Sequence, residues 1–406
     1  MEQGLRHYLV VTGGYWAFTV TDGAIRMLVV LYFHQLGYSP FEVAMLFLFY
    51  EFFGIVTNLL GGWLGARIGL NLTMHIGMGM QVVALAALTV PDAWLSVPYV
   101  MAAQALSGIA KDLNKMSAKA SVKAMVGSGG ESRLFKWVAV LTGSKNALKG
   151  AGYFVGAALL ELAGFRGALA VLAGMLLIVL LGTVLLLPSG VGKMKSKPKF
   201  TQVFSNIPAI NRLSAARFFL FGSRDVWFVV GLPVFLYEVL GWTFMQVGAF
   251  MAFWIIGYGI VQASAPKLLK RSHSGAGPGA GTAQFWAFVL AIFPIGIALG
   301  LQQGWPQETV IVSGLILFGA VFAINSAVHS YLILAYSDRE KVSMNVGFYY
   351  MANAGGRLAG TVLSGLVYQH HGLEGCLWWS AGFVLAAALL SLGLPAVRSE
   401  PASASH

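Results

Sequence analysis

The chain has 406 residues, of which 57% are hydrophobic and only 10% are charged. Soluble domains carry about 25% charged residues, so this composition excludes an ordinary soluble protein. The formal charge of +11 would suggest nucleic acid as a partner of a soluble protein, but here the placement of the charges matters more. Cys376 is the single cysteine, which excludes a disulfide framework, a CxxC motif and a soft-metal cluster.

Long apolar runs recur from end to end, and a helix needs about 20 apolar residues to cross a membrane. The first run follows the polar head Met1–Arg6 without a small-residue cleavage site, so we expect it to serve as the insertion signal. The sequence predicts an all-α integral membrane protein with twelve transmembrane helices, over residues 8–34, 41–65, 73–91, 96–122, 134–160, 167–188, 208–237, 244–266, 283–302, 309–335, 343–369 and 374–396.

A polar segment at 189–207 carries four lysines and divides these helices into two groups of six. The predicted domains are an N-terminal six-helix half at 1–188 and a C-terminal six-helix half at 208–396. A short tail follows at 397–406. A second polar stretch, rich in Gly and Ser, lies at 272–281.

The two halves repeat each other. Leu36-Gly37-Tyr38 matches Leu240-Gly241-Trp242 at an offset of 204, and Gly164-Phe165-Arg166-Gly167 matches Gly372-Leu373-Glu374-Gly375 at 208. A parallel duplication of six helices resembles the major facilitator fold, which holds its substrate near the membrane midplane between the halves. The loop at 62–69 also resembles the signature of that superfamily, with Ala66 in place of its acid.

Lysine and arginine in the short loops predict the orientation. Almost all of them fall on one side, and the opposite loops hold only Arg166 beside several acids. We therefore expect both termini to be cytoplasmic, in a bacterial inner membrane.

Charges inside the predicted helices point to the kind of solute. Eight are basic and four are acidic, so the intramembrane total is +4 if all are ionised. A charge at the centre of a membrane helix costs about 2.5–3.5 kcal/mol, and a bound anion would compensate such cations. The basic residues are Arg26, Lys111, Lys115, Lys145, Lys149, Arg217, Arg224 and Arg357, and the acids are Asp22, Glu51, Asp112 and Asp225.

The spacing of the lysines predicts an anion site. Lys111 and Lys115 share one face of the fourth helix, and Lys145 and Lys149 share one face of the fifth. Two facing pairs would form a cage of ammonium groups. The adjoining amides, Asn114 and Asn146, could donate hydrogen bonds to a phosphate-like or polycarboxylate anion. The alternative is that Lys115 reaches the cytoplasmic surface and that Lys111 merely pairs with Asp112.

In the second half, Arg224 and Arg357 lie mid-span, where a planar guanidinium can bind an oxyanion with two hydrogen bonds. Tyr349, Tyr350 and Asn353 precede Arg357 on the same helix and are candidates to line the cavity. The alternatives are a buried ion pair for Arg224 and ordinary packing for the tyrosines.

The acids are candidates for proton coupling. Asp22 and Arg26 are four residues apart and could simply neutralise each other, or substrate binding to the cation could let the carboxylate take up a proton. Glu51 has no basic neighbour one turn away on its own helix, so it is either a proton carrier or a polar packing contact. Asp112 and Asp225 are expected to be partners of their basic neighbours.

Several strings resemble a narrower family within the superfamily. They include Phe47-Leu48-Phe49-Tyr50-Glu51-Phe52-Phe53-Gly54, Gly143-Ser144-Lys145-Asn146-Ala147-Leu148-Lys149-Gly150 and Arg224-Asp225-Val226-Trp227-Phe228. They are similar to the ArsJ family of organoarsenical efflux permeases, and the resemblance covers nearly the whole chain. It implies export of 1-arseno-3-phosphoglycerate, and a functional link to the glyceraldehyde-3-phosphate dehydrogenase that makes this ester from arsenate.

Two rival functions stay open. A transporter of another organic phosphate would use the same cations. A membrane enzyme acting on a lipid-linked phosphate would need a catalytic cluster, yet the sequence has no HExxH, GxSxG or P-loop motif. We expect a transporter with no cofactor and no metal.

Overall fold

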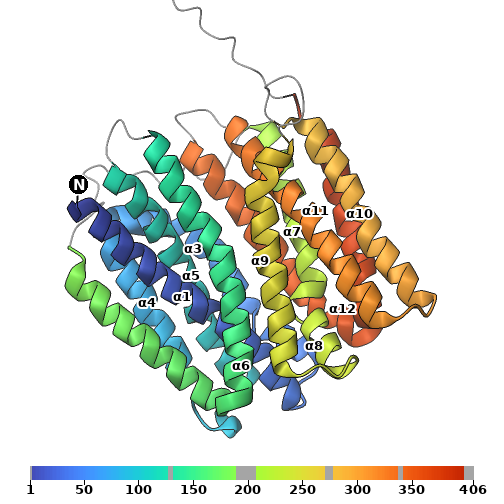
Figure 1. Ribbon diagram of the computed structural model, residues 1–406, viewed down its shortest axis with the longest axis horizontal. Coiled ribbons are helices and arrows are strands. Elements are labelled where there is room, and N and C mark those ends of the chain that lie inside the picture. Colours follow the sequence, from blue (N-terminus) through green and yellow to red (C-terminus); the bar gives the residue numbers. More distant parts are fainter. Residues whose placement is uncertain (1, 127–130, 189–206, 270–277, 337–341, 397–406) are drawn as a thin grey trace, which may run out of the picture.

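The computed structural model describes residues 2–126, 131–188, 207–269, 278–336 and 342–396. The predicted segment 189–207 and the tail 397–406 lie almost entirely outside these ranges, as does most of the polar stretch 272–281. All regular structure in the described part is helical (Figure 1).

The N-terminal half is coloured blue to green in Figure 1. Its elements are α1 (Glu2–Gln35), α2 (Pro40–Met45), α3 (Leu48–Ile68), α4 (Leu70–Ala87), the short 3-10 helix η1 (Asp92–Trp94), α5 (Val97–Val126) and α6 (Glu131–Leu186). The elements of the C-terminal half are α7 (Pro208–Phe228), α8 (Gly231–Glu238), α9 (Phe244–Leu269), α10 (Ala280–Gln302), α11 (Gln307–Ala335) and α12 (Val342–Leu392).

Two very long helices each contain a reversal at a glycine. α6 turns at Gly164 (φ 69°, ψ 176°) and α12 turns at Gly372 (φ 60°, ψ −164°). This backbone region is open essentially only to glycine. Each helix therefore supplies two membrane crossings, and both reversals fall within the repeated Gly-containing strings.

Counting both arms of α6 and α12, the described residues form twelve crossings, six in each half, and the predicted major facilitator fold is confirmed. Nine described helices, α6 and α12 among them, are long and apolar enough to cross a membrane. α5 is not one of the nine, because Lys111, Asp112 and Lys115 lower its mean hydropathy.

Two predicted helices are interrupted. The expected helix 41–65 is split into α2 and α3 by a turn at Leu46 and Phe47, and 208–237 is split into α7 and α8. At the second break the hydroxyl of Ser364 accepts hydrogen bonds from the amides of Val230 and Gly231, each 3.1 Å long. A side chain from α12 thus replaces the helical hydrogen-bond partners.

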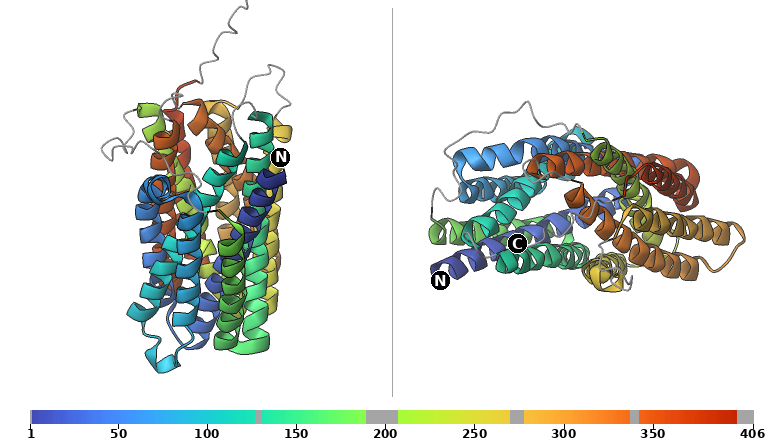
Figure 2. Two further views of the ribbon diagram at one scale, coloured as in Figure 1. Left: turned by 90° about the vertical axis from the view of Figure 1, so that its left-hand side faces the viewer. Right: turned by 90° about the horizontal axis from the view of Figure 1, so that it is seen from above.

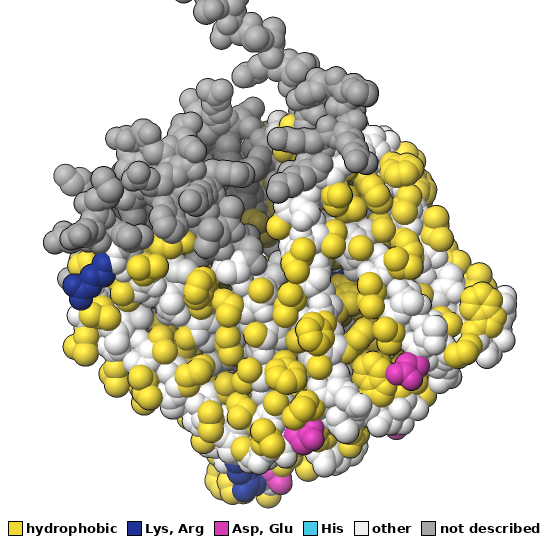
Figure 3. Space-filling model, in the orientation of Figure 1, with side chains coloured by type: hydrophobic (Ala, Val, Ile, Leu, Met, Phe, Trp, Pro, Cys, Tyr) yellow, Lys and Arg dark blue, Asp and Glu magenta, His cyan; other side chains and the backbone are white. Residues whose placement is uncertain are grey.

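The two halves lie side by side, with α6 next to α9 between them (Figures 1 and 2). The face in Figure 3 is hydrophobic over its centre, and its few charged side chains lie near its edges. This distribution fits a protein whose solvent is lipid.

At the end of the bundle that carries α2 and α8, the halves meet in several polar contacts. The amide of Phe41 donates to Gln369 (3.2 Å), the amide of Met245 donates to Glu161 (3.2 Å), and His34 lies 3.5 Å from Glu238. Helix α2 also packs closely on α12, since a Cβ added at Gly365 would lie 2.3 Å from the Cβ of Ala44. The halves are therefore closed against each other at this α2–α8 end.

Candidate substrate site

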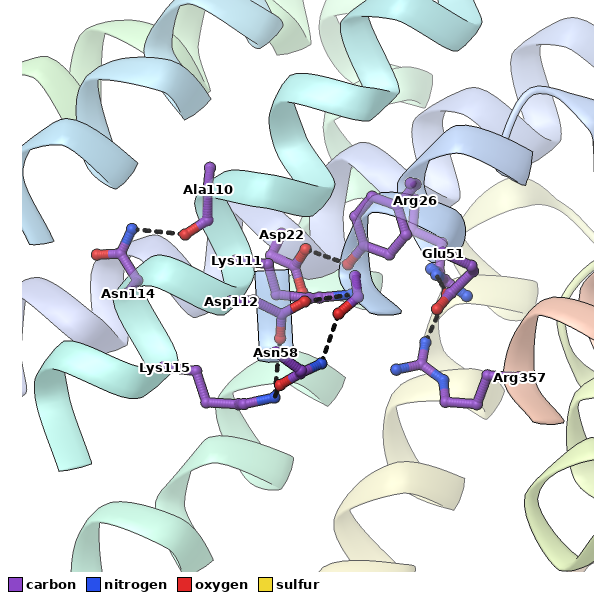
Figure 4. A network of polar contacts seen from close by, with 12 residues as sticks. Asp22, Arg26, Glu51, Asn58, Ala110, Lys111, Asp112, Asn114, Lys115 and Arg357 are labelled. Carbon is purple, nitrogen blue, oxygen red and sulfur yellow. Dashed lines mark hydrogen bonds and ion pairs between the residues drawn. The ribbon is translucent and has the colours of Figure 1, made fainter. Parts of the chain in front are cut away.

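A chain of ion pairs joins the halves near mid-depth. Glu51 of α3 accepts from Arg26 of α1 and from Arg357 of α12, both at 2.7 Å. Arg357 also contacts Asp225 of α7 at 3.2 Å, and Asp225 is paired with its neighbour Arg224. Figure 4 shows Glu51 between the two guanidinium groups that come from different halves.

The lysines extend this network within the N-terminal half. Lys149 of α6 lies 3.8 Å from Asp22 of α1, which also accepts a 2.5 Å hydrogen bond from the hydroxyl of Tyr50. Because 3.8 Å is longer than a direct hydrogen bond, the ammonium group of Lys149 retains capacity for another acceptor.

On α5, Asp112 is shared by two lysines. Lys115 contacts it at 2.8 Å and also donates to the side-chain oxygen of Asn58, whereas Lys111 lies 3.9 Å away. Lys111 instead stacks 4.0 Å above the ring of Tyr50. These pairs, together with the ion-pair chain and the pair formed by Lys149 and Asp22, are called the central charge network below.

Close helix approach makes this arrangement possible. A Cβ added at Gly108 of α5 would lie 2.4 Å from the backbone oxygen of Tyr50, so α3 and α5 approach as only glycine allows. A Cβ at Gly54 would lie 3.1 Å from Asp112 and 3.6 Å from the ammonium of Lys111. The lack of a side chain at Gly54 therefore leaves space for Asp112 and Lys111 against α3.

Most cations of the network have more exposed side chains than its acids. The four acids of the network are buried, with side-chain exposures of 1–6%. Five cations keep 12–17% of their side-chain surface accessible: Lys111, Lys115, Lys149, Arg224 and Arg357. The accessible surface of the network is therefore cationic, with the carboxylates behind it.

The network also carries excess charge. It contains six cations, namely Arg26 and the five accessible ones, against four acids, which leaves two positive charges if all are ionised. In a low-dielectric setting such an excess favours an anionic ligand. Among the described residues, no group of three or more His, Cys, Asp or Glu side chains could hold a metal ion.

The predicted amide donors lie elsewhere. Asn114 donates to the carbonyl of Ala110 on its own helix (2.9 Å) and packs against Gly77 of α4, away from the network (Figure 4). Asn146 faces α9, where it contacts Gln262 at 3.4 Å. Lys145, one turn from Lys149, is half-buried.

The structure shows the partners of two acids whose roles the sequence left open. Asp22 is paired with Lys149 rather than with Arg26, which is bound to Glu51. Glu51 has two basic partners, because cations reach it from other helices. Asp112 and Asp225 are partners of their basic neighbours, as expected.

The predicted substrate-site residues of the C-terminal half fall into two groups. Arg224 and Arg357 belong to the network, whereas Asn353 accepts a 2.9 Å hydrogen bond from Arg217 and Tyr349 is fully buried beside it. Arg217 was counted among the intramembrane cations but was given no role. An intramembrane arginine with no acid within one turn of its helix is the signal that could have singled it out.

Comparison with known proteins agrees with this architecture. The Major Facilitator Superfamily model matches residues 11–328. No curated protein matches the sequence significantly.

Solved structures with the same fold cover nearly the whole chain. The nucleoside transporter NupG (D323A mutant) is 14% identical with a TM-score of 0.72, and the match covers 97% of this chain and 99% of NupG. A POT family transporter in complex with a thioalcohol-conjugated peptide is 12% identical (TM-score 0.77; coverage 95% and 96%). A D-xylose–proton symporter is 13% identical (TM-score 0.71; coverage 96% and 97%). The chain is a multi-pass secondary transporter, not an enzyme, and it belongs to the major facilitator superfamily.

Proposed function

We propose that the protein exports a small organic anion with two negatively charged ends, specifically 1-arseno-3-phosphoglycerate, as part of arsenate detoxification. One observation carries the proposal: five cations present accessible surface between the halves while their acid partners are buried. Two of the strings that resemble the ArsJ family contain cations of this set, namely Lys149 in 143–150 and Arg224 in 224–228.

The donor chemistry supports a pentavalent arsenic ester over trivalent arsenic. Trivalent arsenic requires soft thiolate ligands, but Cys376 is fully buried and its thiol donates to the carbonyl of Ser364 (3.8 Å). The network offers ammonium and guanidinium groups, which suit the hard oxygens of phosphate and arsenate.

The ion pairs suggest how export could be coupled to proton entry. Each acid of the network is paired with a cation, so an anion that engages the cation leaves the carboxylate with less compensation. That carboxylate can then take up a proton, and the complex changes orientation without adding charge. Asp22, held by Lys149 and Tyr50, and Glu51, held by Arg26 and Arg357, are the leading candidates, with Asp112 and Asp225 as further ones.

The proposed cellular setting is the bacterial inner membrane with both termini in the cytoplasm, as the loop charges favour. A glyceraldehyde-3-phosphate dehydrogenase acting on arsenate would supply the substrate. Cysteines placed at Gly281 and Trp305, both exposed at opposite ends of α10, test the orientation. An impermeant maleimide should label the cysteine at 305 in intact cells, and that at 281 only in everted vesicles. The reverse pattern would overturn the orientation.

The function is tested in everted membrane vesicles, where export appears as uptake. The ester is generated outside the vesicles from glyceraldehyde-3-phosphate, arsenate, NAD⁺ as the hydride acceptor and the dehydrogenase, and trapped arsenic is measured with and without a pH gradient. We expect accumulation that depends on the dehydrogenase and on the transporter.

The second candidate is a transporter of another organic phosphate, which the same cations would serve. Competition by 3-phosphoglycerate and by a sugar phosphate separates the two. If the sugar phosphate is accumulated and the ester is not, the arsenical assignment fails and the organic phosphate assignment replaces it.

A further inference from the structure

Arg217 is buried in the C-terminal half without an acidic partner among the described residues. It lies on α7, two turns from Arg224, and is 4% exposed. Its Nε donates to the side-chain oxygen of Asn353 (2.9 Å), and its Nη1 donates to the carbonyl (3.3 Å) and the hydroxyl (3.1 Å) of Ser326. All of these acceptors are neutral, so the full positive charge remains uncompensated in the apolar interior.

The surroundings of Arg217 contain an unused polar group. The Nδ1 of His329, one turn beyond Ser326 on α11, is buried without a hydrogen-bond partner, and this imidazole lies within the electrostatic reach of Arg217. Buried polar groups without partners are uncommon and call for an explanation such as a ligand.

This cluster is linked to the central charge network. Asn353 lies one turn before Arg357 on α12. Gln262 of α9 donates to the hydroxyl of Ser326 (3.3 Å) and accepts from Asn146 of α6, three residues before Lys149. The polar group formed by Arg217, Asn353 and Ser326 therefore lies one to two helical turns from the central charge network along α7 and α12. Gln262 connects this group to Asn146 of α6, in the other half.

We infer that Arg217, with Asn353 and Ser326, forms a second oxyanion half-site that binds one end of a two-ended anion. Lys149, Arg224 and Arg357 bind the other end. The inference rests on the proposed function, because it assumes a substrate with two anionic groups. A planar guanidinium with neutral partners can turn its donors to a phosphate or carboxylate without breaking an ion pair.

The competing explanation is structural, in which Arg217 holds α7, α11 and α12 together through neutral hydrogen bonds. The two explanations differ for Arg217→Gln. If the residue is a ligand-binding cation, its removal relieves a buried charge and leaves the melting temperature of the ligand-free protein unchanged or higher. If it is a structural residue, the melting temperature falls.

The experiment measures binding to the purified full-length protein in lipid nanodiscs. The probes are 3-phosphoglycerate, which carries a phosphate and a carboxylate, and inorganic phosphate, which has one anionic centre. Arg217→Gln is compared with Arg217→Lys and with Arg212→Gln, a control on the same helix whose arginine donates to the carbonyl of Gly393 near the helix start.

We expect Arg217→Gln to weaken 3-phosphoglycerate binding at least about thirtyfold, the lower end of the range for removing one partner of a buried charged contact, and to change phosphate binding less than about threefold. Arg217→Lys should be intermediate and Arg212→Gln unchanged. Equal loss for both probes, wild-type affinity in Arg217→Gln, or no binding of 3-phosphoglycerate to the wild type would overturn the inference. If the arsenic ester is not accumulated in the vesicle experiment, these binding results are unaffected. The proposed substrate and the proposed half-site at Arg217 can therefore be refuted independently.

Discussion

The two halves hold their intramembrane charges in different ways. In the N-terminal half, three lysines of the network are matched by three acids, Asp22, Glu51 and Asp112, with Arg26 as a further cation. In the C-terminal half, Arg224 and Arg357 share the acid Asp225, and Arg217 has only neutral partners among the described residues. The C-terminal half therefore depends on Glu51 of the other half, and within the central charge network the pair between Glu51 and Arg357 joins the two halves.

The difference suggests a division of labour. A lysine is a compact charge on a flexible stem, which can follow a moving anion, whereas an arginine presents donors in a fixed plane. We infer that the C-terminal half orients the substrate and that the N-terminal half responds to it.

Breaking the contact between the halves should have the largest effect. Glu51→Gln leaves Arg26 buried without an acid, and breaking a buried pair from one side costs about 3–5 kcal/mol. We expect lower abundance in the membrane and no detectable transport. The measurements are quantitative blotting and vesicle uptake.

A double variant sharpens this prediction. Arg26→Met combined with Glu51→Gln removes the stranded charge, so abundance should return while transport stays lost. Normal abundance of Glu51→Gln alone would show that the pair does not stabilise the fold.

Removing a lysine should affect transport more than folding. Lys149→Ala takes a cation away from Asp22, which keeps its hydrogen bond from Tyr50. We expect transport to fall about 100-fold at near-normal abundance, because one charged contact to the substrate is lost. Lys145→Ala, one turn away, is expected to lose transport as well.

Arg166→Gln is the matched control for the lysine variants. Its pair with Asp92 is about half exposed at the α2–α8 end, where an ion pair is worth about 0–1 kcal/mol. Transport should be unchanged. Normal transport by both lysine variants would show that Lys145 and Lys149 are not part of the substrate site.

The smallest effect should come from exchanging one kind of cation for the other. Arg224→Lys keeps the charge beside Asp225 but loses the planar fork. We expect about a tenfold weaker affinity for 3-phosphoglycerate with little change in abundance. Lys149→Arg is the reciprocal change. Equal tolerance of both exchanges would contradict the division of labour between the halves.

The sequence was enough for the fold because long apolar runs and a repeated pattern are local signals. The breaks after α2 and α7 were missed because neither is set by local sequence alone, and the one after α7 is stabilised by Ser364 from α12. The charged site residues were visible as charges inside apolar helices. Their pairing was not, because Glu51 finds its partners 25 and 306 residues away.

The predicted placement of the two amides beside the lysines differs from the structure for a related reason. Asn114 and Asn146 adjoin the lysines in sequence, but neighbours along a helix point in different directions, toward α4 and α9. Arg217 was not predicted as a site residue, because its neutral partners belong to α11 and α12 and lie far from it in the sequence.

The reversals at Gly164 and Gly372 bear on how the chain is made. Each is a non-helical glycine between two helical arms, so a very short turn joins two membrane crossings. Because the turn is so short, we expect the fifth and sixth crossings to insert together as a helical hairpin, and likewise the eleventh and twelfth. A side chain at either glycine strains the turn by about 1–3 kcal/mol. Such variants should be degraded during biosynthesis, before they can be scored as transporters.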